Sequence, residues 1–372
     1  MKFNIEIVDD ERKLKDFIEL PYSIYTDYPN WVPPLRSEVR FILGDENPFW
    51  KHAKKTLFVV YDETGKTVGR IAAIIDSNHN SIHKDRTGFI GFFESINDFE
   101  VARLLFDSAF KWLKTNGMEL MRGPVNPSMN DECGLLIEGF DKMPSIMMPY
   151  TPPYYIELFE RYGFVKAKDL YALIKHTADG IPSRIENMVD GIIRKTGVVI
   201  RPLSMKEFAR DIAILKDIYN SAWEKNWGFV PMTDEEIGAS AKRLKDFVDP
   251  DLVLFAYVDG NPVGVTVTIP DINPVLKKLN GNLGPLEIIK FLYYKRKIKG
   301  TRALIGGVKK EYRNLGIIAV LYYQTEMNAR KKGYEWCELG WNLEDNDLIN
   351  RFDISIGARI YKKYRIYEKP IK

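Results

Sequence analysis

The sequence has few residues of the kinds that hold metal ions or form disulfides. Among 372 residues there are two cysteines and four histidines. Cys133 and Cys337 lie too far apart in the chain to form a metal-binding or paired-cysteine motif. His79 and His83 stand four residues apart, but their Asn- and Ser-rich setting predicts a loop. We therefore expect no metal site, and the chain also lacks a Ser-His-Asp arrangement and a Walker loop.

Long apolar runs and an excess of either charge are also missing. No run approaches the roughly 20 apolar residues of a membrane span, and residues 1–6 lack the apolar core of a signal peptide. Fifty-four basic and 51 acidic residues give a net charge of +3, which argues against a nucleic-acid partner. We expect a cytoplasmic globular protein with no membrane partner, and the length predicts roughly two domains.

The chain contains one internal repeat. Two β-rich runs joined by an Asp- and Gly-containing turn predict a hairpin at 57–74, and the pattern recurs at 252–268. A glycine in each hairpin is followed, at nearly equal separation, by a glycine that ends a short amphipathic helix: Gly69 and Gly163 in one half, Gly264 and Gly357 in the other. Two landmarks at matching separations indicate duplication of one α/β unit.

Turn-rich residues and a short helix separate the two halves. We predict an N-terminal domain over 1–180, a linker helix within 181–197, and a C-terminal domain over 198–372. The second half begins with a strand at 198–201 and continues with helices, the hairpin, and then alternating strands and helices. This order predicts a mixed, partly parallel sheet flanked by helices.

The most informative segment joins a strand to a helix near residue 310. The run Ala303–Val308 predicts a strand, and the period of Ile317–Lys331 predicts a helix. Between them lies Arg313-Asn314-Leu315-Gly316-Ile317-Ile318. Helix N-termini carry unpaired N–H groups and positive partial charge, and glycine permits close approach of a ligand. The segment therefore predicts a seat for a pyrophosphate.

In this order of elements, the sequence resembles the GNAT superfamily of acyl-CoA N-acyltransferases. Arg313 to Ile318 is similar to the acyl-CoA loop of that family, (Arg/Gln)-x-x-Gly-x-(Gly/Ala). Residues 197–372 resemble a GNAT domain throughout, and the N-terminal half resembles one more faintly. The resemblance implies an α/β fold of two tandem GNAT-like domains, the first of them degenerate, with acetyl-CoA or a longer acyl-CoA as co-substrate.

The resemblance also implies which residues hold the acyl-CoA. Strand residues would pair with the pantetheine amides, loop and helix N–H groups would hold the pyrophosphate, and Asn346 fits the family's short helix. The implied set is Gly307, Val308, Arg313, Leu315, Gly316, Ile317, Ile318, Ala319 and Asn346.

Two residues depart from the family pattern. Ile318 stands where glycine or alanine usually lets a phosphate approach, and Asp353 stands where a tyrosine usually protonates the leaving thiolate. A surface aspartate is a poor acid at neutral pH unless burial raises its pKa. In the N-terminal copy Phe159 holds the tyrosine position and no Arg-x-x-Gly loop is present, so we expect that copy to shape a substrate groove.

Candidates for catalysis and acceptor binding follow from their places in the pattern. Glu338 could accept the amine proton or could be a solvent-facing strand residue, and Asn342, Tyr361 and Tyr364 complete the reactive set. Polar loop residues and aromatic residues are candidates for the acceptor site, against the alternatives of a surface loop and core packing. They are Asn126, Asn130, Asp131, Glu132, Tyr150, Trp227 and Phe229.

These features favour an N-acyltransferase that moves an acetyl or longer acyl group to an amine acceptor between the domains. The acceptor would be a small molecule or a peptide, and the protein a monomer or a homodimer. A catalytically inactive ligand sensor is one alternative, favoured by Ile318 and Asp353. An aminoacyl-tRNA-dependent transferase is another alternative, supported only by the basic cluster of Lys290, Lys295, Arg296, Lys297 and Lys299. The same cluster could instead be the solvent-exposed face of a helix.

Overall fold

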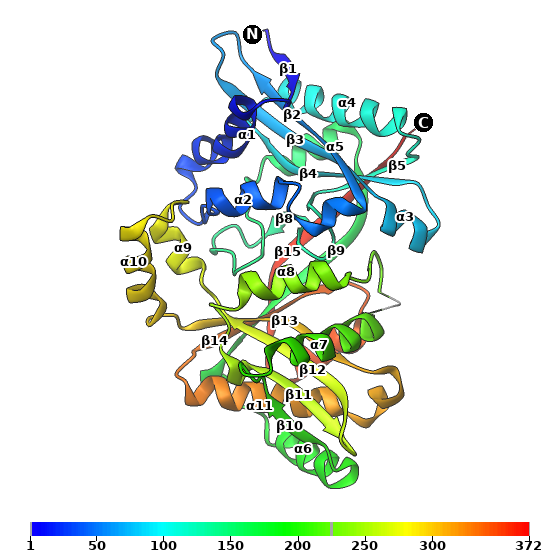
Figure 1. Cartoon of the computed structure of the whole chain (residues 1–372), viewed down its shortest axis with the longest axis vertical. Helices are drawn as coiled ribbons and strands as arrows, with labels where there is room; N and C mark the ends of the chain where they lie inside the picture. Colours follow the sequence, from blue (N-terminus) through cyan, green and yellow to red (C-terminus); the bar gives the residue numbers. More distant parts are fainter. Residues whose placement is uncertain (1, 224–225, 372) are drawn as a thin grey trace. The chain divides into compact units, whose positions relative to one another are not determined.

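The computed structural model describes residues 2–223 and 226–371, which divide into two compact units (Figure 1). The first unit contains residues 1–170, 275–292 and 362–372, and the second contains 171–274 and 293–361. Strands β9 (Val165–His176) and β15 (Arg359–Pro370) each contribute to both units. Each unit is therefore made of separate segments of the chain. The predicted domains, divided at 181–197, are instead each one continuous segment. None of the described helices is both long enough and apolar enough to span a bilayer.

The first unit is built on a mixed sheet in the order β1-β2-β3-β4-β5-β15, with β8 also paired to β15. Among the described strands of this sheet, only β4 and β5 run parallel to one another. Its strands are β1 (Asn4–Ile7), β2 (Ala53–Tyr61), β3 (Thr67–Asp76), β4 (Thr87–Ser95), β5 (Leu120–Gly123), β6 (Val125–Asn126), β7 (Glu132–Cys133) and β8 (Leu135–Glu138). Its helices are α1 (Glu11–Ile24), α2 (Arg36–Leu43), α3 (Ser77–His83), α4 (Phe99–Thr115) and α5 (Tyr155–Tyr162), with short 3₁₀ turns at Tyr25–Asp27 and Pro48–Lys51.

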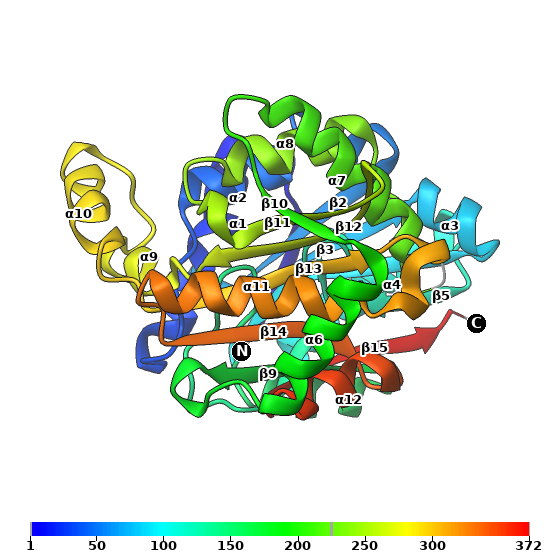
Figure 2. The ribbon, with the colours of Figure 1, turned by 90° about the horizontal axis from the view of Figure 1, so that it is seen from below.

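The second unit repeats this plan with the strand order β9-β14-β13-β12-β11-β10 (Figure 2). Its strands are β10 (Val199–Pro202), β11 (Val253–Val258), β12 (Asn261–Pro270), β13 (Gly300–Val308) and β14 (Trp336–Leu343). Its helices are α6 (Ser183–Thr196), α7 (Phe208–Trp223), α8 (Asp234–Leu244), α11 (Ile317–Lys331) and α12 (Asp347–Ser355), with 3₁₀ turns at Thr177–Asp179, Pro250–Leu252 and Lys310–Leu315. Helices α9 (Asn273–Leu279) and α10 (Pro285–Lys295) extend across the division between the units.

Both units follow the same sequence of elements, which confirms the predicted tandem α/β fold. An antiparallel hairpin is followed by a third strand, a helix, a parallel strand, a short helix and a long strand. Each short helix is followed by a glycine in the left-handed region, Gly163 at φ 93° and Gly357 at φ 96°. Glycine adopts this conformation without the steric cost that a side chain would add, so both helices stop at the same point.

Phe159 packs against other aromatic rings in the core of the first unit. Its ring lies 5.2 Å from Phe93, 5.0 Å from Phe106 and 5.1 Å from Phe164, measured between centroids. Aromatic pairs at such separations add to the stability that burial provides. The position that corresponds to Asp353 is therefore part of an apolar core in this unit.

Local sequence signals explain where several helices begin. The Thr233 side chain accepts from the Glu236 N–H and the Glu236 side chain accepts from the Thr233 N–H, which forms a capping box at the start of α8. The Asp98 side chain accepts from the Glu100 N–H and so caps the start of α4. The predicted loop around His79 and His83 is wrong, because Asp76 caps a short helix there and the two rings lie 4.4 Å apart.

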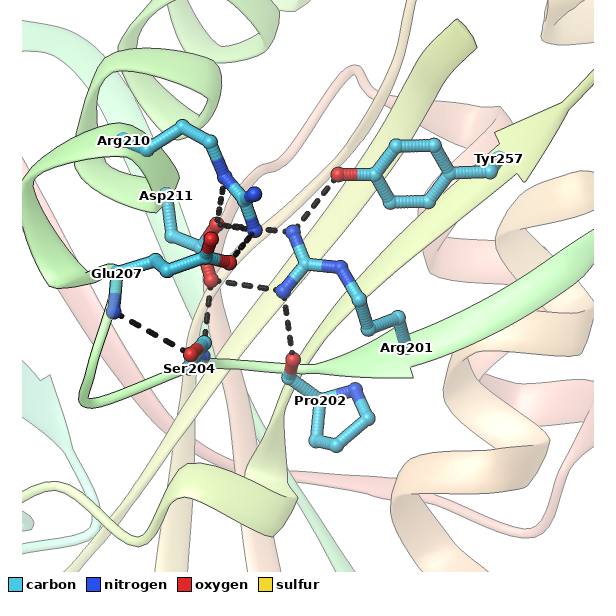
Figure 3. Close-up of polar contacts among 7 residues, drawn as sticks. All are labelled: Arg201, Pro202, Ser204, Glu207, Arg210, Asp211 and Tyr257. Carbon is cyan, nitrogen blue, oxygen red and sulfur yellow. Dashed lines mark hydrogen bonds and ion pairs between the residues drawn. The ribbon is translucent and has the colours of Figure 1, made fainter. Parts of the chain in front are cut away.

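A buried carboxylate joins β10 to α7 in the second unit (Figure 3). Asp211 is fully buried and accepts two hydrogen bonds of 2.8 Å from Arg201 and one of 2.8 Å from the Ser204 N–H. Arg201 also donates to the Tyr257 hydroxyl at 2.7 Å. Burial alone would raise the pKa of Asp211, but these hydrogen bonds outweigh it and hold the pKa below its usual value.

Removing either member of this pair should destabilise the protein. Because Arg201→Met leaves Asp211 buried without its main partner, we expect a loss of about 3 kcal/mol in the free energy of unfolding. The lowered pKa means that the stabilisation is present above pH ~4 and is lost as the pH falls through the folded pKa. Urea unfolding at several pH values measures this, and Arg210→Met, at a half-exposed neighbour, should cost less than about 1 kcal/mol.

Candidate active site

Strands β13 and β14 separate at a bulge in β13. Their parallel pairing runs from Gly300 and Trp336 to Ala303 and Leu339 and then stops. On the other edge of β13, Val267 pairs with Ile305 while Thr268 pairs with Ala303, so Leu304 is an extra residue in that strand. A bulge bends its strand and raises the local twist, which explains why pairing with β14 ends there. Beyond the bulge, β13 has an edge towards β14 that β14 does not occupy.

The segment after β13 turns through Gly316 into helix α11. Residues Lys310–Leu315 form a 3₁₀ turn, and Gly316 has φ 76°, a conformation that favours glycine. A Cβ added to Gly316 would lie 2.6 Å from Cδ1 of Ile192 on α6, so the chain passes close to that helix. The Ala319 N–H donates to the Gly316 carbonyl at 2.9 Å. The predicted strand–glycine–helix geometry is therefore present.

Gly306 and Gly307 of β13 allow side chains to approach from opposite faces. A Cβ at Gly306 would lie 2.3 Å from the Tyr322 hydroxyl, and one at Gly307 would lie 2.6 Å from the Trp223 ring. Ile318 also faces Gly306, with its Cδ1 3.6 Å from the same Cβ position. The Ile318 side chain therefore packs over β13.

Basic residues beside the turn contact α7. The guanidinium of Arg313 donates to the carbonyls of Ser221 at 3.2 Å and Ala222 at 2.9 Å, near the C-terminal end of α7. Lys309 forms an ion pair with Asp217 at 2.5 Å. A cation at a helix C-terminus is favoured by the helix dipole, so Arg313 stabilises this junction.

Asp353 is buried beside the end of β14. It is 1% exposed, and its Oδ2 accepts a 2.8 Å hydrogen bond from the Asn342 amide, which also donates to Asn350 at 3.2 Å. Its Oδ1 has no hydrogen-bond partner among the described residues. Burial raises the pKa of Asp353 to about 7, although the Asn342 hydrogen bond opposes the rise. Burial thus raises the pKa of this aspartate to the range in which its carboxyl can carry a proton at neutral pH.

Glu338 belongs to a second buried polar group. Its Oε1 lies 3.3 Å from Nε of Arg302, and its Oε2 accepts a hydrogen bond from the Tyr361 hydroxyl. Arg302 also donates to the Gly340 carbonyl at 3.2 Å. The alternative of a solvent-facing Glu338 is wrong, because the side chain is 0% exposed and turned towards Arg302. Tyr364, the other predicted tyrosine, is a buried residue of the first unit.

An apolar pocket lies beneath α11 in the second unit. Its volume is about 50 Å³, several times the about 10–15 Å³ that one water molecule needs. Two polar pairs in its wall are satisfied: Lys175 lies 3.5 Å from Glu326, and Thr325 donates to the Leu321 carbonyl. The lining residues are Lys175, Thr177, Ile181, Ile185, Thr268, Thr301, Ala303, Ala319, Tyr322, Tyr323, Thr325, Glu326, Ala329, Trp336, Cys337, Leu339, Phe352 and Ile356.

The pocket follows one face of α11. Its lining residues on that helix run from Ala319 to Ala329, which corresponds to about 15 Å along the axis. Tyr322 belongs to this wall and also contacts the backbone of Gly306, so the pocket begins next to the separated strands. Burial raises the pKa of Cys337 to about 12, which keeps this thiol protonated and unreactive.

Comparison with known proteins assigns the chain to a family. It is 37% identical to protein YghO of Escherichia coli (strain K12) over 371 residues, covering 97% of this chain and 94% of that protein. It is 35% identical to a bacterial ceramide synthase of Caulobacter vibrioides over 368 residues, covering 96% and 95%. The chain belongs to the family of these two proteins. No protein-family model matches the sequence.

A solved structure has the same fold as this chain. A tandem GNAT protein from the clavulanic acid biosynthesis pathway aligns with a TM-score of 0.59 over 100% of this chain and 99% of that protein, at 12% identity. The predicted GNAT fold and the tandem arrangement are therefore confirmed.

In the first unit of this family member, the predicted acceptor residues hold a local hairpin together. Strand β4 has a bulge of its own near Phe92, and the Phe92 N–H donates to Oδ1 of Asn126 at 2.6 Å. Ser128 donates to Asp131 at 2.6 Å and accepts from the Asn130 N–H at 3.1 Å. Glu132 pairs with Asn126 across β6 and β7. Asn126 thus occupies the strand edge that corresponds to the open edge of β13.

The predicted aromatic residues have different surroundings. The Tyr150 hydroxyl donates to the Phe140 carbonyl at 3.0 Å. Phe229 is buried against Tyr219, with ring centroids 5.4 Å apart, and Trp227 is half-buried. Asn346 lies at the start of α12, where its carbonyl accepts from the Asn350 N–H at 3.1 Å.

Sequence reasoning missed the pocket and Tyr322. A helical period through Ile318, Tyr322, Thr325 and Ala329 does mark one face of α11. That period alone cannot separate a packed face from one that lines a pocket, since both are apolar.

Proposed function

We propose that the protein transfers a long-chain acyl group from an acyl-CoA to the amine of a long-chain amino alcohol, forming a ceramide-type amide. The observation that carries this proposal is the apolar pocket, which begins at the separation of β13 and β14 and continues beneath α11. An acetyl group needs no such space, whereas an acyl chain gains free energy by burying its methylenes. The name of the bacterial ceramide synthase, 35% identical to this chain, points to the same substrate class.

The chemistry requires one bond exchange and two proton transfers. The amine nitrogen attacks the thioester carbon, the C–N bond forms, and the C–S bond breaks. Asp353 donates its proton to the departing sulfur, and its pKa of about 7 suits an acid that works at neutral pH. Asn342 holds this carboxyl, and Glu338 is the candidate acceptor of the amine proton, directly or through water.

The acyl donor would be held by backbone groups. The N–H groups around Gly316 would bind the pyrophosphate at the start of α11, as a helix N-terminus favours. The edge of β13 beyond Leu304 would pair with the pantetheine amides. Tyr322 would then lie between the thioester and the pocket, since it contacts Gly306 and also lines the pocket.

The direct test is turnover of a defined pair of substrates. The purified protein is mixed with palmitoyl-CoA and sphinganine, and free CoA thiol and the amide product are measured together. Equal formation of both supports the proposal. Acyl-CoA binding without thiol release would instead favour the sensor, and salt-sensitive binding of charged tRNA without acyl-CoA binding would favour the tRNA-dependent transferase.

Filling the pocket should change the chain length that the protein accepts. Ala329 lines the pocket on α11 at the end away from Tyr322. Ala329→Phe should therefore lower kcat/KM for palmitoyl-CoA by about tenfold or more while changing turnover of a short acyl-CoA by less than about threefold. Ala329→Ser, which adds little volume, is the matched control. An equal loss of kcat/KM with both donors would show that the pocket does not hold the acyl chain.

A further inference from the structure

Helix α10 presents its apolar side to solvent. Six of the sixteen large hydrophobic side chains that are exposed among the described residues fall within 283–293: Leu283, Leu286, Ile288, Ile289, Leu292 and Tyr293. Leu286 is 69% exposed, Ile289 65% and Leu292 58%. An isolated exposed leucine needs no explanation, but a contiguous apolar patch marks an interaction surface.

The helical period explains how these side chains gather. Leu286, Ile289 and Tyr293 stand three and four residues apart, so they share one face, with Leu292 beside them. Glu287, Phe291 and Tyr294 are only half-exposed or less and lie on the opposite face. The exposed face of α10 therefore carries large apolar side chains, whereas the exposed face of an ordinary surface helix is polar.

Basic residues lie around the apolar face. Within 283–299 there are five basic residues and one acid, Glu287. Lys290 lies on α10 itself. The exposed residues Arg296 and Lys297 follow directly after the helix. Lys297 donates to the Tyr293 hydroxyl at 2.9 Å, which keeps a cation next to the apolar side chains.

The turn before α10 is anchored to the first unit. Val275 and Leu279 of α9 are buried, and the Arg36 guanidinium donates to the Asn280 carbonyl at 3.2 Å. Lys277 also donates to the Pro29 carbonyl. The chain that leads into α10 is therefore fixed at a defined place.

We propose that α10 docks onto the surface of a membrane that contains anionic lipids. An apolar helix face flanked by basic residues inserts at the level of the headgroups, and the basic side chains bind the negative surface. The prediction of no membrane partner rested on the lack of a spanning segment, and a helix that lies on the surface needs none. This proposal goes beyond acyl transfer, because surface binding requires no turnover.

Vesicle flotation with the full chain and no substrate tests the proposal. We expect binding to vesicles of phosphatidylglycerol and phosphatidylcholine, weaker binding to phosphatidylcholine alone, and loss of binding at high salt. Leu286→Ser with Ile289→Ser should lower the partition coefficient about tenfold or more. The control is Met188→Ser with Ile193→Ser, which removes two exposed apolar side chains from α6.

Three outcomes would overturn the proposal. The wild type could fail to float, or the two double variants could bind vesicles equally. Alternatively, sedimentation velocity could show a dimer that the α10 variant converts to a monomer without any vesicle binding, which would make a second copy the occupant of this face. None of these outcomes bears on thiol release from acyl-CoA, so the proposed transfer is tested separately.

Discussion

Asp353→Asn should lower kcat for acyl transfer by about 100-fold or more while changing the affinity for acyl-CoA little, because a general acid acts on the transition state. The wild-type kcat should fall as the pH rises through about 7, where Asp353 loses its proton. Asparagine cannot donate a proton in this way, so the variant should lose that alkaline limb. Steady-state kinetics between pH 5.5 and about 9 measure both effects.

The matched control for this prediction is Asp347→Asn. Asp347 lies on the same helix but is exposed, so the same side-chain replacement is made there without the burial. Its kcat and pH profile should stay close to those of the wild type. If both variants lost activity equally, or if Asp353→Asn kept the alkaline limb, Asp353 would not be the proton donor.

The raised pKa of Asp353 also predicts how stability depends on pH. The usual pKa of 3.8 rises to about 7 in the folded protein, so the native state holds a proton that the unfolded state has lost between those values. Stability from this group is therefore complete below pH ~4 and declines as the pH rises to about 7, by at most about 4 kcal/mol. Asp353→Asn should remove this decline, which chemical unfolding measures independently of catalysis.

The fold could be predicted because its signals are local and occur twice. The hairpins at 57–74 and 252–268 and the glycines that end α5 and α12 are short-range patterns that need no knowledge of tertiary contacts. Duplication also tests the prediction, because the order of elements found in one half should recur in the other. Helix α3 was missed because His79 and His83 occur among residues with weak helix propensity, while the cap from Asp76 depends on geometry.

The candidate site was harder to predict because burial decides its chemistry. Asp353 follows the polar pattern of a short helix, and only the packed structure removes it from water and pairs it with Asn342. Arg302 precedes Glu338 by many residues, and the parallel register that brings them together is non-local. The separation of β13 from β14 depends on an extra residue at Leu304, which leaves no mark in composition.

Gly316→Glu should weaken acyl-CoA binding by about 100-fold or more. The new side chain would need φ 76°, its Cβ would lie 2.6 Å from Ile192, and its negative charge would lie beside the proposed pyrophosphate seat. Calorimetry with palmitoyl-CoA on the wild type and the variant measures the loss. Strong and equal binding by both proteins would rule out this seat.

Gly333→Glu is the control that distinguishes loss of the pyrophosphate site from the general loss of stability on replacing a glycine of positive φ. Gly333 has φ 79°, nearly the same as Gly316, but it follows the other end of α11, and a Cβ there meets no neighbouring atom of the described residues within 4 Å. Both variants carry the left-handed strain of about 1–2 kcal/mol, so both should unfold at lower temperature than the wild type. Only Gly316→Glu should lose acyl-CoA, because only it brings a charge to the N-terminus of α11. Gly316→Ala, which carries the strain and the Ile192 contact without the charge, should fall between the two, and its position measures how much of the lost affinity is electrostatic.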